Sequence, residues 1–383
     1  MQLNNEIEVA EAVSEGHPDK ICDQIADKIL DECLKQDSNS RVACEVFITK
    51  EYILIGGEIT SKAILNYKKI AREVLRNIGY LKKDIGIGCD SCKINVLIKK
   101  QSKELGETVE NSSKKICAGD QCIVVGFATN DNKSYIPNSI FLANEIMKTA
   151  NLLRKKNKFK YARPDMKTQV IIKNKKIENI LISVQHDEKI DDKYFKKFIY
   201  EEILLKTAKK YKFNTDFNFS INPSNNFVLG GPLADTGLTG RKLMCDTYGV
   251  NCSHGGGAFS GKDATKIDRS AAYYARYIAK NLVASKISEK IEIKIIYEIG
   301  FSKPTKIVFN TFKPNYNNSI IKKVIEIFFD ASVENIINYF SLKKPSFNYY
   351  DISTYGHFGR LDLNLPWEKL DKVNDIKKYL SKY

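Results

Sequence analysis

Residues 19–36 read DKICDQIADKILDECLKQ, and residues 41–59 read RVACEVFITKEYILIGGEI. Apolar residues in the first stretch have the spacing of an amphipathic helix, and the second stretch is typical of two β-strands. Another amphipathic stretch, AILNYKKIAREVLRNIGY, follows at residues 63–80. Together these stretches predict an α+β unit in which two helices cover one face of a β-hairpin.

The same order of elements recurs twice, roughly every 125 residues. The second and third copies are expected as helix, hairpin and helix at 139–157, 167–187 and 194–211, and at 268–285, 292–312 and 319–340. We therefore predict an α+β fold of three similar repeats, with domains at 1–102, 115–229 and 230–383 and chain crossings between them. A doubly wound parallel sheet is the alternative, but it needs strands separated singly by helices, whereas these come in pairs.

Composition excludes several classes of protein. The 383 residues are 43% hydrophobic and 28% charged, as in ordinary globular proteins. No apolar run approaches the roughly 18 residues that a membrane helix needs. The polar, acidic start MQLNNEIEVAEAVSEG does not resemble a secretory signal. We expect a cytoplasmic protein that does not contact a membrane.

The nine cysteines are expected to be reduced thiols, because no secretory signal precedes them. Cys89 and Cys92 form a C-x-x-C pair that could be half of a zinc site. A second pair at comparable spacing is missing, so buried or partly exposed free thiols are the favoured interpretation.

The net charge of +15, from 61 basic and 46 acidic residues, allows nucleic acid, a membrane surface or small anions as partners. The lysines are scattered over predicted helix faces, as in KKNKFK at 155–160. No basic strand with interleaved aromatic residues and no recognition-helix motif accompanies them. We therefore expect no nucleic acid as the main ligand.

A glycine-rich stretch, HGGGAFSGKDATK at residues 254–266, has the spacing of a phosphate-binding loop up to Lys262. The next position of such a loop must be Ser or Thr to hold magnesium, and here it is Asp263. The stretch could be a damaged phosphate loop, a chance glycine cluster or a different means of binding polyphosphate. Glycines that let the backbone approach a ligand, beside Arg241, Lys242 and Lys262, favour a polyphosphate site.

His17, Pro18 and Asp19 stand at the start of the first predicted helix. A helix N-terminus with a histidine and a carboxylate could hold a phosphate, or a metal bound to one. The alternative is an ordinary helix start, since Pro at the first position and Asp in the first turn both favour helices.

The chain resembles the S-adenosylmethionine synthetase (methionine adenosyltransferase) family over essentially its whole length. The resemblance rests on GHPDKICDQIAD, VACEVFITKEYILIGGEIT, CAGDQC, RPDMKTQV, GGPLADTGLTGRK, HGGGAFSGKDATKIDRSAAYYARYIAKN and YGHFGRLDLNLPWEK, in that order. It implies three α+β repeats around a pseudo-threefold axis. It also implies a transferase of one-carbon metabolism that moves the adenosyl group of ATP to the sulfur of L-methionine. Triphosphate is expelled and then hydrolysed to pyrophosphate and phosphate.

The resemblance also implies roles for individual residues. Its catalytic set is His17, Lys167, Asp235, Arg241, Lys262 and Lys266. Its ATP-binding set is His17, Asp165, Met166, Lys167, Asn226, Phe227, Asp235, Arg241, Lys242, Ala258 and Lys262. Methionine is expected at Glu58, Gln101, Asp235 and Lys266. A flexible loop is expected at Gln101, Ser102, Lys103, Glu104, Leu105 and Gly106.

Ions and partner subunits are expected on the same ground. The family uses two Mg²⁺ and one K⁺ per active site, and the matching residues are Asp19 for Mg²⁺, Glu45 for K⁺ and Asp268 for a possible second Mg²⁺. Asp120 matches a further acidic position of the site. A homodimer with active sites between its subunits is expected, with dimers paired into a homotetramer.

The chain departs from the family at several positions. Cys122 replaces a usual Gly, Ala264 replaces Pro and Asn226 replaces Arg, while SKELGETVENSSKK follows Gln101 in place of the usual gate loop. Loss of a proline removes a backbone constraint, and loss of an arginine removes a phosphate or base contact. We expect activity to be retained, with altered affinity and loop kinetics.

Overall fold

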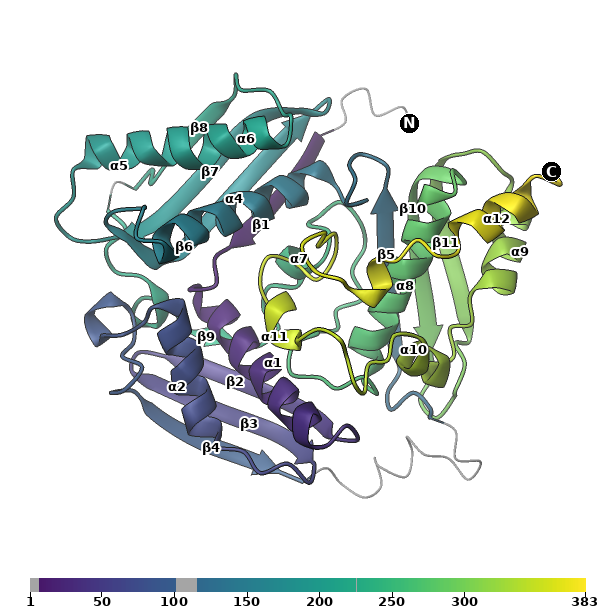
Figure 1. Cartoon of the computed structure of the whole chain (residues 1–383), viewed down its shortest axis with the longest axis horizontal. Helices are drawn as coiled ribbons and strands as arrows, with labels where there is room; N and C mark the ends of the chain where they lie inside the picture. Colours follow the sequence, from purple (N-terminus) through teal and green to yellow (C-terminus); the bar gives the residue numbers. More distant parts are fainter. Residues whose placement is uncertain (1–6, 101–115, 225) are drawn as a thin grey trace.

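Three separate β-sheets organise the chain, and helices pack against each of them (Figure 1). The structure is a computed structural model that describes residues 7–100, 116–224 and 226–383. Each of the three predicted hairpins is antiparallel, and the order of strands in the sheets is β4-β3-β2-β9, β1-β6-β7-β8 and β11-β10-β5. The fold is therefore α+β, and it is not a doubly wound parallel sheet.

The first sheet lies beneath two helices. Its strands are β2 (Arg41–Thr49), β3 (Tyr52–Thr60), β4 (Lys93–Lys99) and β9 (Gly237–Leu238), and its helices are α1 (Pro18–Gln36) and α2 (Tyr67–Ile78). A short 3-10 helix, Lys83–Ile85, precedes β4. Alternate residues of β2, such as Val42, Val46 and Ile48, are buried under α1, whereas Glu45 and Phe47 point to the other face. The period of two in the sequence thus decides which face the helices cover.

The second sheet has the same plan. Its strands are β1 (Ile7–Val13), β6 (Ala162–Lys173), β7 (Lys176–His186) and β8 (Asn218–Ile221). Helix α4 (Asn138–Lys155) packs against it, together with a continuous helical rod made of α5 (Asp192–Phe198), a π-helical stretch (Ile199–Leu205) and α6 (Lys206–Lys210).

The third sheet packs against a helix that is buried along nearly its whole length. Its strands are β5 (Cys122–Thr129), β10 (Ser288–Tyr297) and β11 (Lys306–Pro314), and α8 (Ile267–Ala284) lies against them. The remaining helices are α7 (Leu243–Asp246), α9 (Asn318–Phe328), α10 (Val333–Tyr339), α11 (Tyr349–Ile352) and α12 (Val373–Leu380), with 3-10 turns at Gly231–Leu233 and Pro366–Glu368.

The single helix expected at 319–340 is wrong, because the structure divides it into α9 and α10. The Asp330 carboxylate accepts the Ser332 N–H at 2.9 Å, and the Ala331 carbonyl accepts the Tyr297 hydroxyl at 2.6 Å. Val333 N–H bonds the Ser302 carbonyl at 2.9 Å. These bonds to side chains and a distant loop replace the helical bonds that a continuous helix would make.

The chain crosses from one sheet to another at three strands. β1 pairs with β6, β5 pairs with β10, and the short β9 pairs with β2. Each sheet therefore contains a strand that comes from a part of the chain distant from its own hairpin. The domain boundaries at 1–102, 115–229 and 230–383 stay a prediction.

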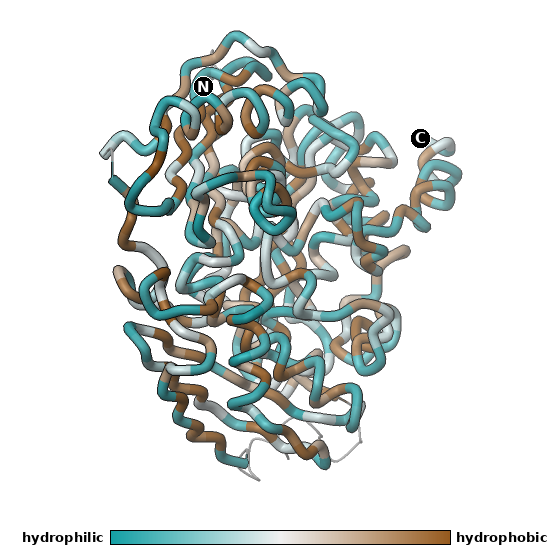
Figure 2. The backbone as a smooth tube through the Cα atoms, turned by 60° about the vertical axis from the view of Figure 1, so that its left-hand side comes forward, coloured by the Kyte–Doolittle hydropathy of each residue, from teal (hydrophilic) through white to brown (hydrophobic). Residues whose placement is uncertain are grey.

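Hydrophobic residues gather in two cores. One joins the helices of the first and third sheets, and the other lies between the second sheet and its helices. Figure 2 shows hydrophobic and hydrophilic stretches interspersed along the backbone. Within residues 7–100, 116–224 and 226–383, no helix is long and apolar enough to cross a membrane.

Candidate active site

One face of α1 carries four aspartates spaced four residues apart: Asp19, Asp23, Asp27 and Asp31. All four are buried, and each accepts a backbone N–H from a segment that is distant in sequence. The donors, in order along the helix, are Leu238 at 2.9 Å, Gly240 at 2.9 Å, Gly261 at 2.8 Å and Tyr349 at 2.8 Å. The first three carboxylates fix the glycine-rich segments to α1, and Asp31 fixes the segment at Tyr349.

The N-terminus of α1 brings three predicted site residues together. His17 is the N-cap, and its Nδ1 accepts the Asp19 N–H at 3.2 Å, while the Asp19 carboxylate accepts Lys242 Nζ at 2.6 Å. Burial, with Lys242 and Lys167 nearby, lowers the pKa of His17 to about 3. Its imidazole is neutral near pH 7, so the 3.9 Å approach of Nδ1 to the Asp19 carboxylate is not an ion pair.

Because Nδ1 of the neutral His17 ring accepts a hydrogen bond, the ring proton lies on Nε2. Burial alone would raise the pKa of Asp19, but hydrogen bonds from Lys242 and Leu238 lower it below its usual value. The cluster therefore offers an imidazole N–H, a carboxylate and a lysine at one helix end, a suitable surface for phosphate groups and their cations.

Arg241 and Asp235 lie beside this cluster, and both side chains are exposed. Arg241 Nε is 3.8 Å from Asp19 Oδ1, and its Nη1 donates to the Thr236 carbonyl at 3.3 Å. Asp235 Oδ1 accepts a local N–H, from Thr236 at 2.9 Å. Both side chains thus remain accessible to a ligand.

Lys262 and Asp268 form a second part of the site. Lys262 Nζ donates to Asp268 Oδ2 at 2.6 Å, and the Cys122 thiol donates to Asp268 Oδ1 at 2.9 Å. Burial and the neighbouring Asp268 raise the pKa of Cys122, which keeps it a neutral thiol. The cysteine that departs from the family pattern therefore bonds directly to an acidic residue of the predicted site.

Asp263 does not face a ligand. It is buried, its Oδ2 accepts the Val42 N–H at 2.7 Å and Lys266 Nζ at 2.8 Å, and its Oδ1 accepts the Thr265 hydroxyl at 2.6 Å. Burial would raise its pKa, but Lys266 and Thr265 lower it. No strand leads directly into the 254–266 segment, so it has neither the magnesium ligand nor the context of a P-loop.

Two glycines, Gly237 and Gly261, allow the segments that carry them to approach α1 and β2 closely. A Cβ on Gly237 would lie 2.3 Å from the Pro18 carbonyl carbon. A Cβ on Gly261 would lie 2.0 Å from the Cys44 carbonyl oxygen, and its φ of +77° favours glycine. Gly237 and Gly261 therefore allow these segments to pack closely against α1 and β2.

The predicted ATP-binding residues of β6 differ from one another in burial and bonding. Asp165 is buried, its Oδ2 accepts the Gly231 N–H at 2.9 Å, and its Oδ1 has no partner among the described residues. Burial raises the pKa of Asp165 to about 6. Met166 instead lies in the second core, and its N–H and carbonyl both bond Ser14. The alternation of β6 leaves Lys167 exposed.

Other predicted residues lie elsewhere on the surface. Glu45 and Glu58 are both exposed on the outer face of the first sheet, away from α1. Asn226 lines a separate open pocket with His186 and Glu188, and the Phe227 N–H bonds His186 Nε2 at 3.3 Å. Ala258 packs directly against Gly240, because a Cβ on Gly240 would lie only 2.4 Å from the Ala258 Cβ.

The expected loop residues Gln101, Ser102, Lys103, Glu104, Leu105 and Gly106 lie outside the described residues. Asp120 is exposed and accepts the Gln121 N–H at 2.8 Å.

The described part of the chain contains no group of three or more His, Cys, Asp or Glu residues that could hold a metal, and the nine cysteines are free. The zinc alternative for Cys89 and Cys92 therefore has no further ligands there. Magnesium needs fewer protein ligands, because it is commonly held by one or two carboxylates together with substrate phosphates. The oxygen donors of Asp19 and Asp268 fit that requirement.

Several residues that shape the site were missed from the sequence. They are Lys20, Asp23, Asp27 and Arg269, all of them buried. The signal was present, since aspartate recurs every fourth residue from 19 to 31 and so lies along one helix face.

Comparison with known families and proteins gives one answer along the chain. The S-adenosylmethionine synthetase N-terminal, central and C-terminal domain models match residues 5–103, 115–227 and 229–369.

Relatives match at full length. The S-adenosylmethionine synthase of Mycoplasma mycoides subsp. mycoides is 53% identical, over 98% of this chain and 99% of its own. The synthase of Mesoplasma florum is 52% identical, over 96% and 98%, and that of Finegoldia magna is 43% identical, over 99% and 100%. The chain belongs to the S-adenosylmethionine synthetase family.

Proposed function

We propose that this chain joins ATP and L-methionine at the N-terminus of α1, where the 235–242 and 261–268 segments meet it. The adenosyl group passes to the methionine sulfur, and triphosphate leaves and is hydrolysed to pyrophosphate and phosphate. The observation that carries this site assignment is the cluster of His17, Asp19 and Lys242, in which a neutral imidazole, a carboxylate and a lysine meet at a helix start.

The chemistry requires no activated protein nucleophile. A thioether sulfur has a free lone pair and no proton to lose, so the residues need only align it with the ribose C5′ and stabilise the leaving triphosphate. Lysine and arginine side chains supply positive charge for that purpose, and Lys242, Lys262 and Arg241 all lie at or near the edge of the site.

His17 is suited to donate rather than accept a hydrogen bond at the polyphosphate. Its neutral ring keeps a proton on Nε2 at physiological pH, because its pKa is lowered to about 3. The Nε2–H group would hydrogen-bond a phosphate oxygen as charge grows there. Lys167 and Lys266 complete the proposed catalytic set, with Asp235 between the two substrates.

The adenosine part of ATP is assigned to Asp165 and the residues around it. The unpartnered, buried Oδ1 of Asp165 is an acceptor that lacks a donor, and a ligand N–H or O–H would satisfy it. Met166, Asn226, Phe227 and Ala258 are proposed to line the same part. Glu58 and Gln101, with Asp235 and Lys266, are proposed for methionine.

The proposed cofactors are two Mg²⁺ and one K⁺ per site. Asp19 and Asp268 would hold Mg²⁺, with Asp120 nearby, and Glu45 would hold K⁺. Bound Mg²⁺ would neutralise phosphate charge. The Asp19 carboxylate is suited to this role because its pKa is lowered, so it stays ionised.

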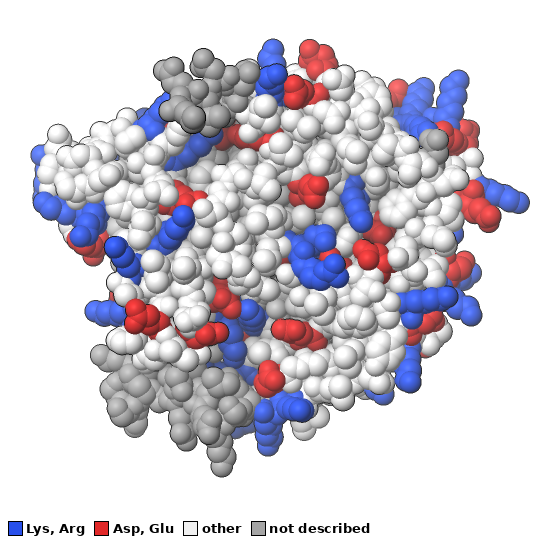
Figure 3. Space-filling view, turned by 180° about the vertical axis from the view of Figure 1, so that it is seen from behind, with Lys and Arg blue, Asp and Glu red and all other residues white. Residues whose placement is uncertain are grey.

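Self-association is proposed because the three sheets are covered by helices on one side only. Glu45 and Glu58 lie on the uncovered side of the first sheet with the exposed side chains of Phe47 and Leu97. Figure 3 shows the molecule from behind, where a broad uncharged area surrounds a central group of charges. A homodimer across this face, paired into a tetramer, and a pseudo-threefold arrangement of the three repeats, are parts of the proposal.

The test is methionine-dependent consumption of ATP. The purified chain is incubated with ATP and Mg²⁺, with and without L-methionine, and the sulfur product is identified by mass spectrometry. S-adenosylmethionine in the complete mixture supports the proposal. ATP consumption without any sulfonium product would contradict it.

A further inference from the structure

A buried lysine joins α1 to the segment that follows the basic residues of the site. Lys20 is 1% exposed, and its Nζ donates to Asp23 Oδ2 at 3.0 Å and also to Asp246. Asp246 ends α7, and its N–H bonds the Lys242 carbonyl at 3.0 Å. Lys20, Asp23 and Asp246 are all buried, and their charged groups bond to one another.

Asp23 has a second bond that leads directly to the site. Its Oδ1 accepts the Gly240 N–H at 2.9 Å, while Oδ2 is occupied by Lys20. Gly240 has a φ of +77°, and a Cβ there would lie 2.4 Å from Ala258 Cβ, so this position requires glycine. Glycine has no side chain that could bond the segment to α1. The Asp23 carboxylate is therefore its anchor on α1.

Three contacts with α1 flank the segment that carries Arg241 and Lys242. Leu238 N–H is held by Asp19, Gly240 N–H by Asp23 and the end of α7 by Lys20 through Asp246. Arg241 and Lys242 stand between the second and third of these points. Displacement of Gly240 would move both basic groups relative to Asp19.

The charges of the enclosed group are unequal, since two carboxylates share one ammonium group. Burial raises the pKa of Asp23 to about 7, although Lys20 opposes the shift. Burial alone would lower the pKa of Lys20, but Asp23 and Asp246 raise it. A neutral side chain of the same shape at position 23 is therefore compatible with the buried site, and Asn can be tested there.

We infer that Asp23 is a positioning residue for the adenosyl transfer. By holding Gly240 it fixes the positions of Arg241 and Lys242, and so it determines the affinity of the site for triphosphate. The inference rests on the proposed function, in which these two residues face the polyphosphate. A fixed arrangement of charge is what stabilises a leaving group efficiently, because no reorganisation is then needed.

The test compares Asp23→Asn with Asp31→Asn. Both aspartates lie in the α1 row and use both oxygens as acceptors, and an amide supplies one acceptor in place of two. Asp31 holds Tyr349 and Tyr350, which are not part of the 235–242 segment. Inorganic tripolyphosphate with Mg²⁺ is the probe, measured by calorimetry, and KM values for ATP and methionine are measured separately.

Asp23→Asn is expected to weaken tripolyphosphate binding about tenfold, the effect of one lost hydrogen bond. KM for methionine should change by less than about twofold, and Asp31→Asn should leave tripolyphosphate affinity unchanged even where it lowers the melting temperature. If wild-type protein binds tripolyphosphate and Asp23→Asn binds it equally well, the inference is overturned. If wild-type protein fails to bind it, the proposed function itself fails.

Asp23→Ser is the second variant, since its hydroxyl retains one acceptor in a smaller volume. It should show the same selective loss of tripolyphosphate affinity. If neither variant folds, Asp23 is needed for folding itself and the positioning role is overturned. Equal losses for tripolyphosphate and methionine would also overturn it, because they would indicate general disruption.

Discussion

Asp27 and Arg269 form a buried two-point ion pair, with Oδ1 to Nη1 at 2.6 Å and Oδ2 to Nη2 at 2.9 Å. The pair joins α1 to α8, and Asp27 Oδ1 also accepts the Gly261 N–H at 2.8 Å. Arg269 lies over the Tyr349 ring at 4.2 Å. One ion pair thus connects the first unit, the third unit and the segment that carries Lys262.

Arg269→Lys should destabilise the protein by about 3 kcal/mol or more, because lysine cannot make the two-point contact and leaves Asp27 incompletely paired. Urea unfolding measures the change. Lys206→Arg is the control, since Lys206 forms an exposed pair with Glu202 that contributes little. Equal unfolding midpoints for Arg269→Lys and wild type would show that the pair does not stabilise the junction.

Asp19→Asn should fold and lose most of its activity. The amide keeps the shape but offers one acceptor for Leu238 N–H and Lys242 Nζ, and it lacks the charge expected to hold Mg²⁺. The measurement is kcat over a titration of Mg²⁺, with circular dichroism to verify folding. Turnover near the wild-type value at ordinary Mg²⁺ concentration would remove Asp19 from the proposed metal site.

Lys262→Ala should lower kcat by roughly 10²–10³, the usual effect of losing one electrostatic contact to a developing charge. Methionine binding should change less, because Lys262 pairs with Asp268 and not with Glu58. Steady-state kinetics for both substrates measure the difference, with Lys206→Ala as a control on the distant surface. A change in KM for methionine without a fall in kcat would assign Lys262 a different role.

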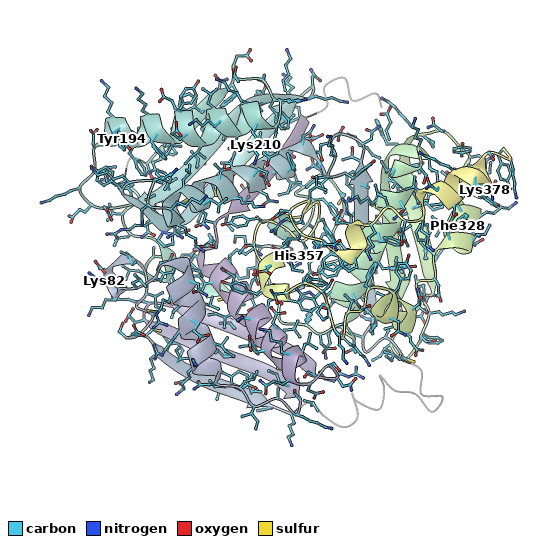
Figure 4. All side chains as sticks on the ribbon, viewed as in Figure 1. Lys82, Tyr194, Lys210, Phe328, His357 and Lys378 are labelled. Atoms are coloured by element: carbon cyan, nitrogen blue, oxygen red, sulfur yellow. The ribbon has the colours of Figure 1, made fainter. Side chains whose placement is uncertain are left out.

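The pH dependence of stability should contain a contribution from His357, which Figure 4 labels near the centre of the molecule. Its Nδ1 bonds the Tyr273 hydroxyl at 2.8 Å, and burial lowers its pKa well below 6.5. Below pH 6.5 the unfolded chain binds a proton at this residue that the folded chain does not, so stability falls as pH falls.

His357→Gln should remove that contribution. The stability of wild type should fall more steeply between pH 6.5 and 5 than that of the variant, by at most about 1.4 kcal/mol per pH unit for one proton. Urea unfolding at several pH values compares the slopes. Parallel slopes for the two proteins would mean that His357 is protonated in the folded state as well.

Local patterns in the sequence predicted the helices and hairpins well, because apolar residues in each unit recur with the spacing of a helix or of a strand. They could not predict that β1, β5 and β9 pair with strands far along the chain, since pairing depends on tertiary packing. Nor could they predict that α9 and α10 separate at Asp330, where bonds to a distant loop end the first helix.

The candidate site was predicted in the same uneven way. The motifs located His17, Asp19, Lys242 and Lys262, which the structure places in direct contact with one another or with acidic partners. The residue types alone did not reveal that Asp263 points inward and pins its segment to β2. The direction in which a loop side chain points depends on its neighbours in space. For Asp263 that neighbour is β2, which is distant in sequence from residues 254–266.

The most direct test of the proposed function is the identity of the phosphorus products. The protein is incubated with ATP, Mg²⁺, K⁺ and L-methionine, and the mixture is followed by phosphorus NMR. Pyrophosphate and phosphate should appear in equal amounts, together with S-adenosylmethionine, because the whole triphosphate leaves C5′ and is then split. Accumulation of ADP would contradict the account, because it would mean that the 254–266 segment acts as a true P-loop relative and transfers only the terminal phosphate.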